Sequence, residues 1–507
     1  MLLLILSGLF FLAIFISNRR WRTQGRLPLP PGPKGYPIIG NLLDLPTLTP
    51  WKTFRDWTNV YGDLVYLDLP MRPTIILGSA KAAYDLLEKR SDIYSDRHVS
   101  VMIDLSGWEF NVGLMHYSQR WRAHRRAFQQ YFNIRAYQQW KPIQLEEIRL
   151  FLRRLLDNPA GVEQDTRLLL STIILRIVYG MNVTSTGDDF LRIVYESVRG
   201  MSEAGVYGAY WVDYVPVLQY LPDWFPGTRY RKVASKIRKT VDEMRTRPIN
   251  DLMERMETDS VESCVASALI SKAREHCQTP DEWAIQDDII TNITGITYAA
   301  GVETTNVAVQ FFYIAMCLFP EVQKAAQAEL DTVVGSNRLP TFDDQDNLVY
   351  IRAVVMESVR WQLVIPSGVA HRSTRDDEYD GYFIPAGTEV IPNAWAMLHD
   401  PEEYPDPHAF KPERYIKDGR INPDVRDPST IAFGFGRRIC AGRHMATSTL
   451  YLIITSVLHT FDIDFQDGES FDPETMILTG ITSAPAKVPC VVRPRSRDAE
   501  QLVRCSA

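Results

Sequence analysis

The most informative part of the sequence is "AFGFGRRICAGRHMA", from Ala432 to Ala446, which places a single cysteine among glycines and arginines. Glycine permits tight turns in which backbone N–H groups point toward one atom. Hydrogen bonds to a sulfur stabilise its thiolate form and tune a metal that the sulfur binds. A lone cysteine is most often an inert buried side chain. Here the glycines on both sides of Cys440 favour a loop that presents a thiolate as a ligand.

Other interpretations of the cysteines fit the sequence less well. The stretch lacks the third glycine of a dinucleotide fingerprint, and no strand–helix–strand unit surrounds it. The six cysteines contain no CxxC pair and no zinc-type spacing, so neither a zinc site nor a disulfide framework is expected. This pattern is typical of a reducing compartment, where a thiol acts through its own chemistry.

Length and composition indicate one large globular domain. The chain has 507 residues without an internal repeat, a low-complexity tract or a Gly/Ser linker. Its hydrophobic content of 45% and charged content of 23% are ordinary for a protein with a sizeable core. The net charge of -7 argues against a general nucleic-acid binder, so no nucleic-acid partner is expected.

The N-terminus predicts a membrane anchor. Residues 1–17 carry no charge, and arginines follow at positions 19, 20 and 22. A cleaved signal peptide has basic residues before its apolar run, which is the reverse order. Because positive charge stays on the cytosolic side, the sequence predicts a transmembrane helix over 1–18 with the rest of the chain in the cytosol. A basic collar and a proline-rich hinge that serves as a stiff spacer follow over 19–45, and the catalytic domain covers 46–507.

The remainder of the chain reads as mainly α with small β-sheets. Apolar residues recur with helical period over Leu145–Leu156, Leu168–Tyr179 and Asp287–Leu318. Short strand-like runs occupy Leu64–Asp68, Thr74–Leu77 and Glu389–Ile391. The aromatic and proline-rich stretch Tyr207–Gly227 follows neither period, and it is either a buried loop or a surface that enters a membrane interface.

The pattern Phe433-Gly434-x-Gly436-x-Arg438-x-Cys440-x-Gly442 resembles the haem-ligand signature of the cytochrome P450 family. The resemblance implies a single haem-thiolate domain of the P450 fold, with haem b as cofactor. It makes Cys440 the axial ligand of the haem iron. It further implies that the flanking signature residues contact the cofactor, namely Phe433, Gly434, Arg438 and Gly442.

Two further segments match the family in its order along the chain. In "VVMESVRW", Glu357 and Arg360 are three residues apart and share one helix face, where they can pair. Such a pair is common on solvated surfaces. In "FKPERY", however, Arg414 corresponds to the family's third member of a buried network, which implies a structural role for all three residues.

The helix from Asp287 contains "YAAGVETTNVAV", in which polar residues interrupt an apolar run. Buried polar groups cost free energy unless they are satisfied, and a helix glycine costs about 1 kcal/mol relative to alanine. A local kink, with the threonines bonded to the preceding turn, would explain them structurally. The stretch is similar to the family's oxygen-activation motif, which implies that Gly301 leaves room for dioxygen while Thr304 and Glu303 deliver protons.

Haem propionates need cationic or hydrogen-bonding partners. In "SQRWRAHRRAF", Trp121 and Arg125 lie on one helix face and resemble the family's WxxxR element, and His371 and Arg438 occupy similar positions in family members. A solvated basic face would produce the same arginine pattern. The two uses are compatible, because outward arginines would form a positive docking patch on an acidic protein.

The resemblance also implies partners and a location. The chain has no flavin or nicotinamide fingerprint, so its electrons would come from NADPH-cytochrome P450 reductase, with cytochrome b5 as a second candidate donor. Nearly the whole chain is similar to a fungal microsomal branch of the family that includes O-methylsterigmatocystin oxidoreductase and tryptamine 4-monooxygenase. The expected location is therefore the endoplasmic reticulum membrane, with a single span.

We expect a monooxygenase that inserts one oxygen atom from O2 into a hydrophobic small molecule, in secondary-metabolite tailoring. The lining inferred from the resemblance is mostly apolar and small, and comprises Leu105–Met115, Tyr298–Thr304, Leu363–Ala370 and Leu478–Ala484. Three alternatives remain open: a broad xenobiotic-oxidising enzyme, a peroxide-rearranging enzyme without a reductase, and a non-catalytic haem sensor or carrier.

Overall fold

The computed structural model describes residues 26–506 apart from positions 71, 99, 184, 186, 206–208, 214, 223, 259–260, 474 and 480. The expected transmembrane anchor over 1–18 and the first part of the basic collar lie outside the described residues. So do parts of two stretches singled out in the sequence, 207–227 and 478–484.

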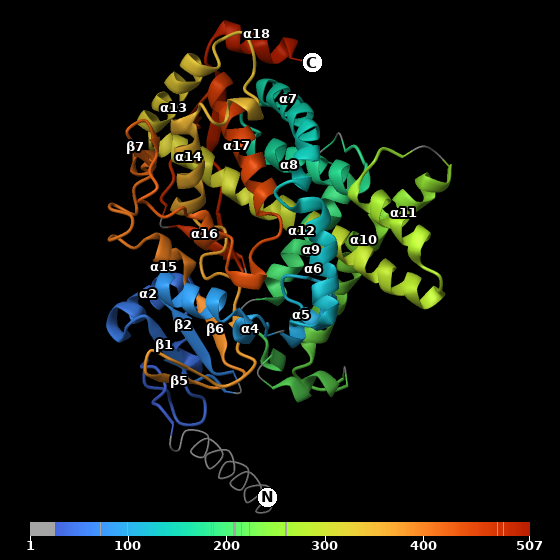
Figure 1. Cartoon of the computed structure of the whole chain (residues 1–507), viewed down its shortest axis with the longest axis vertical. Helices are drawn as coiled ribbons and strands as arrows, with labels where there is room; N and C mark the ends of the chain where they lie inside the picture. The colour runs from blue at the N-terminus through green and yellow to red at the C-terminus, as the bar shows by residue number, and fades with distance from the viewer. Residues whose placement is uncertain are drawn as a thin grey trace, which may run out of the picture.

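The described chain is mainly helical with small sheets, as the sequence predicts (Figure 1). The helices of eight or more residues are α2 (Pro50–Tyr61), α6 (Gln119–Phe132), α7 (Lys141–Asp157), α8 (Val162–Tyr179), α9 (Asp189–Ala204), α10 (Arg229–Thr258), α11 (Val265–His276), α12 (Pro280–Leu318), α13 (Pro320–Val333), α14 (Val349–Trp361), α17 (Arg443–Thr460) and α18 (Arg497–Cys505). The short ones are η1 (Leu42–Asp44), α3 (Ala80–Ala83), η2 (Tyr84–Lys89), α4 (Ser91–Tyr94), α5 (Val101–Leu105), η3 (Ala136–Trp140), η4 (Trp211–Asp213), η5 (Pro216–Tyr220), η6 (Phe342–Asp344), α15 (Ala394–Leu398), η7 (Pro412–Tyr415), α16 (Ser429–Ala432) and η8 (Gly436–Arg438).

The strands form one four-stranded sheet and several two-stranded ones. The larger sheet has the order β1-β2-β6-β3, with β1 (Leu64–Leu67), β2 (Thr74–Leu77), β6 (Glu389–Pro392) and β3 (His371–Arg372). β2 pairs in parallel with β6, and the other two pairings are antiparallel. The two-stranded sheets join β4 (Asp377–Tyr379) to β5 (Tyr382–Ile384), β7 (Ile416–Lys417) to β8 (Arg420–Ile421), β9 (Phe461–Phe465) to β12 (Cys490–Pro494), and β10 (Met476–Thr479) to β11 (Thr482–Pro485).

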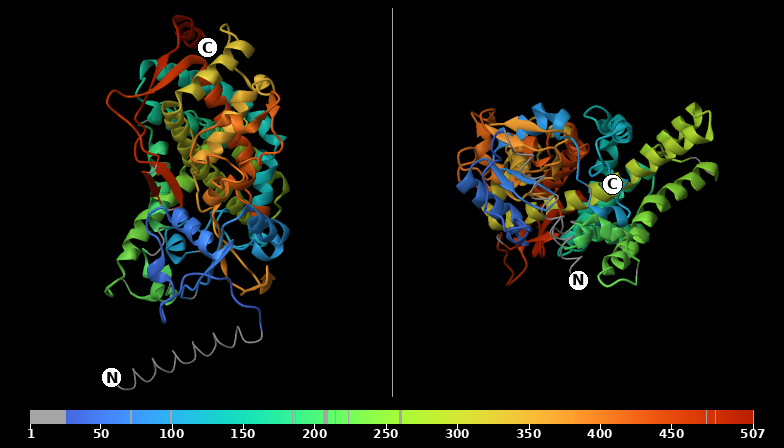
Figure 2. Two further views of the ribbon diagram at one scale, coloured as in Figure 1. Left: turned by 90° about the vertical axis from the view of Figure 1, so that its left-hand side faces the viewer. Right: turned by 90° about the horizontal axis from the view of Figure 1, so that it is seen from below.

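Helix α12 runs through the middle of the helical body and organises the core. It packs against α8, α10, α11, α6, α9 and α17, so most of its length from Ile289 onward is buried. The larger sheet lies at the end of the molecule where the described chain begins, and α18 lies at the opposite end (Figures 1 and 2). The core is therefore built around the helix that carries the expected oxygen-activation motif.

The predicted helices lie within α7, α8 and α12, and the predicted strands coincide with β1, β2 and β6 to within one residue. All three helices begin earlier than predicted, and the difference is largest for α12, which begins at Pro280 and not at Asp287. Thr279 accepts a hydrogen bond from the backbone N–H of Glu282, whose carboxylate in turn accepts from the N–H of Thr279. This capping box starts the helix in exposed polar residues, ahead of the apolar period.

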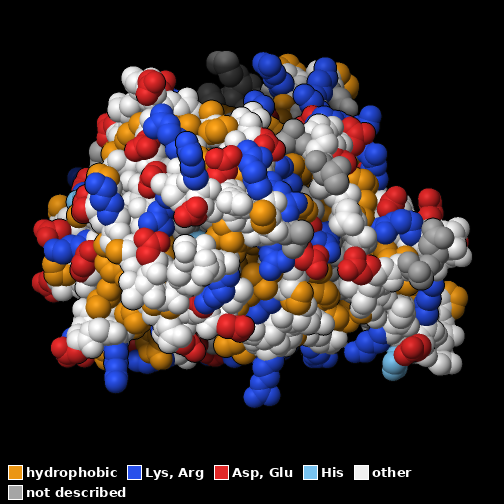
Figure 3. All heavy atoms as spheres, turned by 90° about the horizontal axis from the view of Figure 1, so that it is seen from above, with side chains coloured by type: hydrophobic (Ala, Val, Ile, Leu, Met, Phe, Trp, Pro, Cys, Tyr) orange, Lys and Arg blue, Asp and Glu red, His pale blue; other side chains and the backbone are white. Residues whose placement is uncertain are grey.

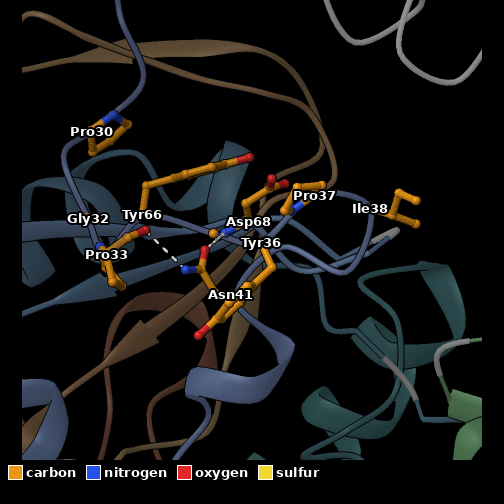
Figure 4. Close-up of a pocket in the computed structure, with 10 residues that line it drawn as sticks. Pro30, Gly32, Pro33, Tyr36, Pro37, Ile38, Asn41, Tyr66 and Asp68 are labelled. Carbon is orange, nitrogen blue, oxygen red and sulfur yellow. Dashed lines mark hydrogen bonds between the residues drawn. The ribbon is translucent and has the colours of Figure 1, made fainter. Parts of the chain in front are cut away.

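The proline-rich segment from residue 26 onward packs against the sheet. The carbonyl of Pro31 accepts from the N–H of Tyr66 at 2.8 Å. The buried side chain of Asn41 accepts from the N–H of Asp68 at 2.7 Å and donates to the carbonyl of Pro33 at 3.0 Å (Figure 4). These contacts border an open groove of about 460 Å³. This part of the segment is thus attached to the domain.

Most described aromatic residues of the stretch 207–227 are exposed. Trp211, Tyr220 and Trp224 expose 68%, 79% and 81% of their surface. In η4, Val212 is buried, whereas its neighbour Trp211 is exposed. The buried-loop interpretation is therefore wrong for these residues. The stretch lies at the same end of the molecule as the proline-rich segment (Figures 1 and 2).

Within the described residues, no single helix combines the length and apolar composition that a membrane span requires. The pair α12 and α13 meets those criteria together but bends by 103° between its members. At the end that carries α18, acidic and basic side chains are interspersed (Figure 3).

Candidate functional site

The loop that carries Cys440 has a conformation that depends on glycine. Gly434 and Gly436 have φ angles of 76° and 57°, in the left-handed region that side chains disfavour. A Cβ on Gly436 would lie 2.1 Å from the carbonyl oxygen of Leu87. The N–H of Cys440 donates to the carbonyl of Phe433 at 2.8 Å, which closes the loop. The glycines of the motif thus fold the chain back on itself immediately before the thiol.

Cys440 lies just before α17, whose N-cap is Gly442. Burial raises the pKa of its thiol, whereas hydrogen bonding from the N–H groups of Gly442 and Arg443 and the positive charges of Arg125 and Arg443 lower it. Cys440 is nevertheless exposed, so one side of the residue borders open space. The N-terminus of a helix and nearby cations favour a thiolate. The arrangement suits a sulfur that ligates a metal.

The expected N–H donors come from only part of the loop. Gly442 supplies one, as the sequence predicts, and Arg443 supplies another. The N–H groups of Gly434 and Gly436 instead donate to the carbonyl of Ile431 at 3.0 Å and to a carboxylate oxygen of Glu88 at 2.7 Å. These two glycines therefore shape the loop and do not bond the sulfur.

Arg125 connects α6 to this loop. One Nη of its guanidinium donates to the carbonyl of Ile439 at 2.6 Å, next to Cys440. Burial lowers the pKa of Arg125, and the Cys440 thiol opposes that shift. The predicted pair on α6 is thus split in function: Arg125 contacts the thiol loop, whereas the indole N–H of the buried Trp121 donates to the carbonyl of Val112 at 3.1 Å.

Arg438 is buried against Trp121. Its guanidinium carbon lies 4.4 Å from the centre of the indole ring. It donates to the carbonyls of Ser95 and Met115, each at 2.7 Å. Burial lowers the pKa of Arg438 to about 10. The Arg438 guanidinium is held by carbonyls and an aromatic face, and no carboxylate of the described residues is among its hydrogen-bond partners.

A second buried arginine, Arg97, lies in the same cluster and was not among the expected residues. Only 4% of it is exposed, and it donates to the carbonyls of Gly113, Val369 and Ala370 at 2.5–3.0 Å. Burial, followed by the positive charge of Arg438, lowers its pKa. The sequence offers no periodic or motif signal for it, because Arg97 stands alone in a loop far from its partners along the chain.

His371 is buried beside these arginines in β3. Its Nδ1–H donates to the carbonyl of Tyr94 at 2.6 Å. Burial, and then the charge of Arg97, hold the pKa of His371 well below its usual range, so the ring is neutral. The predicted His371 and Arg438 therefore lie in one neighbourhood. Arg438 is a cation there, whereas His371 is a neutral ring whose one N–H is donated to Tyr94.

These charges suit a dianionic cofactor. Arg97, Arg125 and Arg438 are largely buried, and in the described part of the chain none of them forms an ion pair with a carboxylate. Asp96 is the acid that most favours the charge of Arg438, and its carboxylate accepts from the N–H of Tyr117 and faces His116. Buried cations are stable when an anion compensates them. The two propionates of haem b, together with a thiolate for its iron, fit this set of residues.

The expected oxygen-activation motif lies in the middle of α12. The Thr304 hydroxyl donates to the carbonyl of Ala300 at 2.7 Å, and Ala300 is exposed although α12 is a core helix. Burial raises the pKa of Glu303, and Arg167 on α8 opposes that shift. No hydrogen bond or ion pair joins Glu303 or Thr304 to the thiol loop among the described residues. The Thr304 hydroxyl thus lies next to the open space beside Ala300.

Gly301 has a packing role in addition to the one that the resemblance implies. A Cβ at this position would lie 3.0 Å from Cδ1 of Ile174 on α8. Its missing side chain therefore lets α12 approach α8 closely. The space for a small molecule would lie on the side of Ala300, because the open face of the helix begins there.

The predicted network behind the site is assembled as one buried unit. Both guanidinium-to-carboxylate distances between Arg360 and Glu357 are 2.8 Å, and Nε of Arg414 donates to Glu357 at 3.3 Å. All three side chains are at least 95% buried. The network ties α14 to η7 and to the segment before it.

Comparisons with known proteins agree with this geometry. The family model described as Cytochrome P450 matches residues 30–488. The chain is 39% identical to the cytochrome P450 monooxygenase COX2 of Coprinopsis cinerea, over 99% of this chain and 95% of that protein. It is 40% identical to the monooxygenase ple1 of Rhodocybe pseudopiperita, over 94% and 91%, and 36% identical to claR of Ampulloclitocybe clavipes, over 94% and 89%. With a buried arginine cluster beside a glycine-shaped thiol loop, this chain belongs to the cytochrome P450 family of haem-binding monooxygenases.

Proposed function

We propose that this protein hydroxylates a hydrophobic small molecule in fungal secondary metabolism, with electrons from an NADPH-dependent reductase. The observation that best supports this proposal is the position of Cys440. It lies at the N-terminus of α17 and accepts hydrogen bonds from the N–H groups of Gly442 and Arg443. A thiolate donates electron density to a haem iron and thereby favours O–O cleavage. The fungal relatives named above support the family-level activity.

Each residue of the site has a distinct task in this proposal. Cys440 ligates the iron, and Arg97, Arg125 and Arg438 hold the propionates through charge-assisted hydrogen bonds. The indole of Trp121 lies against Arg438, and the neutral ring of His371 lies in the same neighbourhood. The remaining signature residues shape the loop around the thiol, namely Phe433, Gly434 and Gly442.

Proton delivery is assigned to α12. The Thr304 hydroxyl donates to Ala300 in the same helix and can rotate to donate toward the open side of α12. Glu303 retains its proton to higher pH than an ordinary carboxyl group, because burial raises its pKa. Neighbouring residues of a helix do not face each other, and no hydrogen bond joins these two side chains among the described residues. In this proposal a water molecule therefore carries the proton from Glu303 to the Thr304 hydroxyl.

The substrate is expected to be apolar. In the described lining, Phe110, Met115 and Leu363 are buried, and the N–H of Ser483 donates to the carbonyl of Val364 at 2.8 Å, which joins β11 to this lining. A lining of apolar side chains favours burial of an apolar ligand. This chemistry supports tailoring of a hydrophobic metabolite and equally permits xenobiotic oxidation, which a substrate screen would distinguish.

Membrane association is supported by exposed apolar residues at one end of the molecule. The proline-rich segment and the stretch that contains η4 and η5 lie at the same end of the molecule (Figures 1 and 2). The first exposes Tyr36, Ile38 and Leu43, and the second exposes Trp211 and Trp224. Amphipathic aromatic side chains favour the membrane interface. With the apolar residues 1–17, they support attachment to the endoplasmic reticulum membrane.

The reduced protein treated with carbon monoxide tests the central assignment. We expect the red-shifted Soret band of a thiolate ligand, and Cys440→His should retain haem without that shift. A folded wild-type protein that binds haem without the shift would contradict the thiolate assignment. Reductase-dependent NADPH consumption with product formation then separates an oxygenase from a haem carrier and from a peroxide-rearranging enzyme.

A further inference from the structure

Two cysteines far apart in the sequence touch in the structure. The sulfur atoms of Cys317 and Cys490 lie 3.5 Å apart, although the two residues are 173 positions apart along the chain. Cys317 stands one residue before the end of α12, and Cys490 is the first residue of β12. Both are free thiols. A disulfide would require the sulfurs to approach by about 1.5 Å, to the S–S length of about 2.0 Å.

The two thiols differ in accessibility. Cys317 is partly exposed, whereas Cys490 is fully buried. The strand that contains Cys490 is held in place, because this residue pairs with Phe465 in β9 and its carbonyl accepts from Gln466 at 3.3 Å. An oxidant can therefore approach Cys317 more easily than Cys490, whose sulfur is held in contact with that of Cys317.

We propose that Cys317 and Cys490 form a reversible oxidation site in which hydrogen peroxide converts the thiol pair into a disulfide between α12 and β12. In the first step the sulfur of Cys317 attacks one peroxide oxygen, the O–O bond breaks, and Cys317 becomes a sulfenic acid while one water leaves. In the second step the sulfur of Cys490 loses its proton and attacks the Cys317 sulfur, and the second water leaves. The sulfurs lose two electrons in total, and the peroxide gains them.

The geometry sets the order and the speed of these steps. The hydrogen bond to Cys490 and burial raise the pKa of Cys317, so the thiolate is scarce and the first step is slow compared with that of an exposed thiol. Once a sulfenic acid forms, the neighbouring thiol captures it before a second peroxide can reach it. The product is a disulfide and not a sulfinic acid, and a dithiol reductant restores the pair.

The experiment uses the purified full-length holoenzyme, incubated with hydrogen peroxide, alkylated, and digested without reduction for mass spectrometry. We expect a peptide pair joined through Cys317 and Cys490, lighter by about 2 Da than the sum of the two reduced peptides, because two hydrogen atoms are lost. Dithiothreitol should remove it. Cys505→Ser, which alters an exposed cysteine outside the pair, should form the same cross-link.

Two variants separate this site from random thiol oxidation. In Cys490→Ser, Cys317 should accumulate as a sulfenic acid that dimedone traps, because no thiol remains to capture it. In Cys317→Ser, the buried Cys490 should stay unmodified. The proposal is wrong if wild-type protein with an unchanged carbon monoxide spectrum oxidises at Cys505 but never forms the cross-link, or if Cys317 is trapped equally with and without Cys490.

Discussion

Glu357 and Arg360 form a bidentate ion pair in which neither side chain exposes any surface. The remaining guanidinium N–H groups of Arg360 donate to carbonyls of Leu398, Pro407 and Ala409, which lie before the segment that leads to the thiol loop. Glu357 also accepts from the N–H of Lys411 at 2.8 Å. A single turn of α14 thereby fixes several backbone positions of an irregular segment.

Removing one partner of this ion pair should prevent the protein from holding haem stably. Glu357→Ala strands the Arg360 charge, and breaking a buried pair costs about 3–5 kcal/mol. We expect a ratio of haem to protein several-fold below that of the wild type, measured by the pyridine haemochrome spectrum against total protein. Glu402→Gln changes an exposed carboxylate nearby and should leave the ratio unchanged. Full haem content in Glu357→Ala would show that the network is dispensable.

Two glycines of the signature should respond differently to alanine. Gly436→Ala forces a side chain into a φ of 57° and places its Cβ 2.1 Å from the Leu87 carbonyl, so we expect loss of folded protein. Strain of the backbone alone costs about 1–2 kcal/mol. Gly442 has a φ of -88°, and a Cβ there would meet nothing within 4 Å.

We therefore expect Gly442→Ala to fold with an unchanged unfolding temperature but with a shifted Soret band, since the added methyl group enters the open space beside Cys440. Differential scanning fluorimetry and the absorption spectrum measure the two effects. Equal destabilisation by both alanines would contradict the distinction between the two glycines.

How far the sequence predicts this structure depends on the distance over which each feature is encoded. Helices α7 and α8 were predictable because the apolar period follows from local burial. The early start of α12 was also readable, since Thr279 and Glu282 have the spacing of a capping box. The contacts of Arg97 were not, because its carbonyl partners at Val369 and Ala370 lie more than 270 positions away.

The functional residues divide in the same way. Cys440 and the pair Glu357 and Arg360 belong to short motifs whose members lie within one turn or loop, so spacing alone predicts their proximity. The packing of Gly301 against Ile174 could not be predicted, because a glycine in a helix does not reveal which neighbour packs against it. The contact between Cys317 and Cys490 arises only when α12 and β12 pack together.

Arg97 should hold the cofactor as firmly as the residues of the recognised motifs. Arg97→Met removes a buried cation and leaves three carbonyls without their donor. We expect haem to transfer to excess apomyoglobin about tenfold faster, which corresponds to about 1.4 kcal/mol. Arg97→Lys keeps the positive charge but lacks the planar guanidinium, so its rate of haem transfer should lie between those of the wild type and Arg97→Met. Arg437→Met, at an exposed position in the same loop as Arg438, is the matched control and should not change the rate.

Thr304 is expected to govern how efficiently electrons are used. Thr304→Ala removes the hydroxyl on the open side of α12, so proton delivery should fail while reduction continues. We predict that NADPH consumption persists and that most of it appears as hydrogen peroxide, measured with a peroxidase-coupled dye. Thr304→Ser keeps the hydroxyl and should retain product formation. A Thr304→Ala enzyme with wild-type coupling would remove Thr304 from the proton path.

Electron delivery is expected at the basic surface next to the thiol loop. Tyr117 connects two of its exposed arginines: the guanidinium of Arg122 lies 5.3 Å from the ring, and Arg437 donates to the hydroxyl at 2.7 Å. Arg126 is exposed one turn further along α6, the helix whose Arg125 bonds the thiol loop at Ile439. A reductase docked at this surface would therefore lie next to the loop that carries Cys440.

Arg126→Glu should weaken reductase binding. We expect a several-fold rise in the reductase concentration that gives half-maximal turnover at low salt, and a smaller rise at high salt, because exposed charges are screened. Arg497→Glu changes the net charge equally at an exposed position on α18, away from this surface (Figure 1), and should have little effect. If both variants impair turnover to the same extent, the total charge of the protein, and not this surface, directs the reductase.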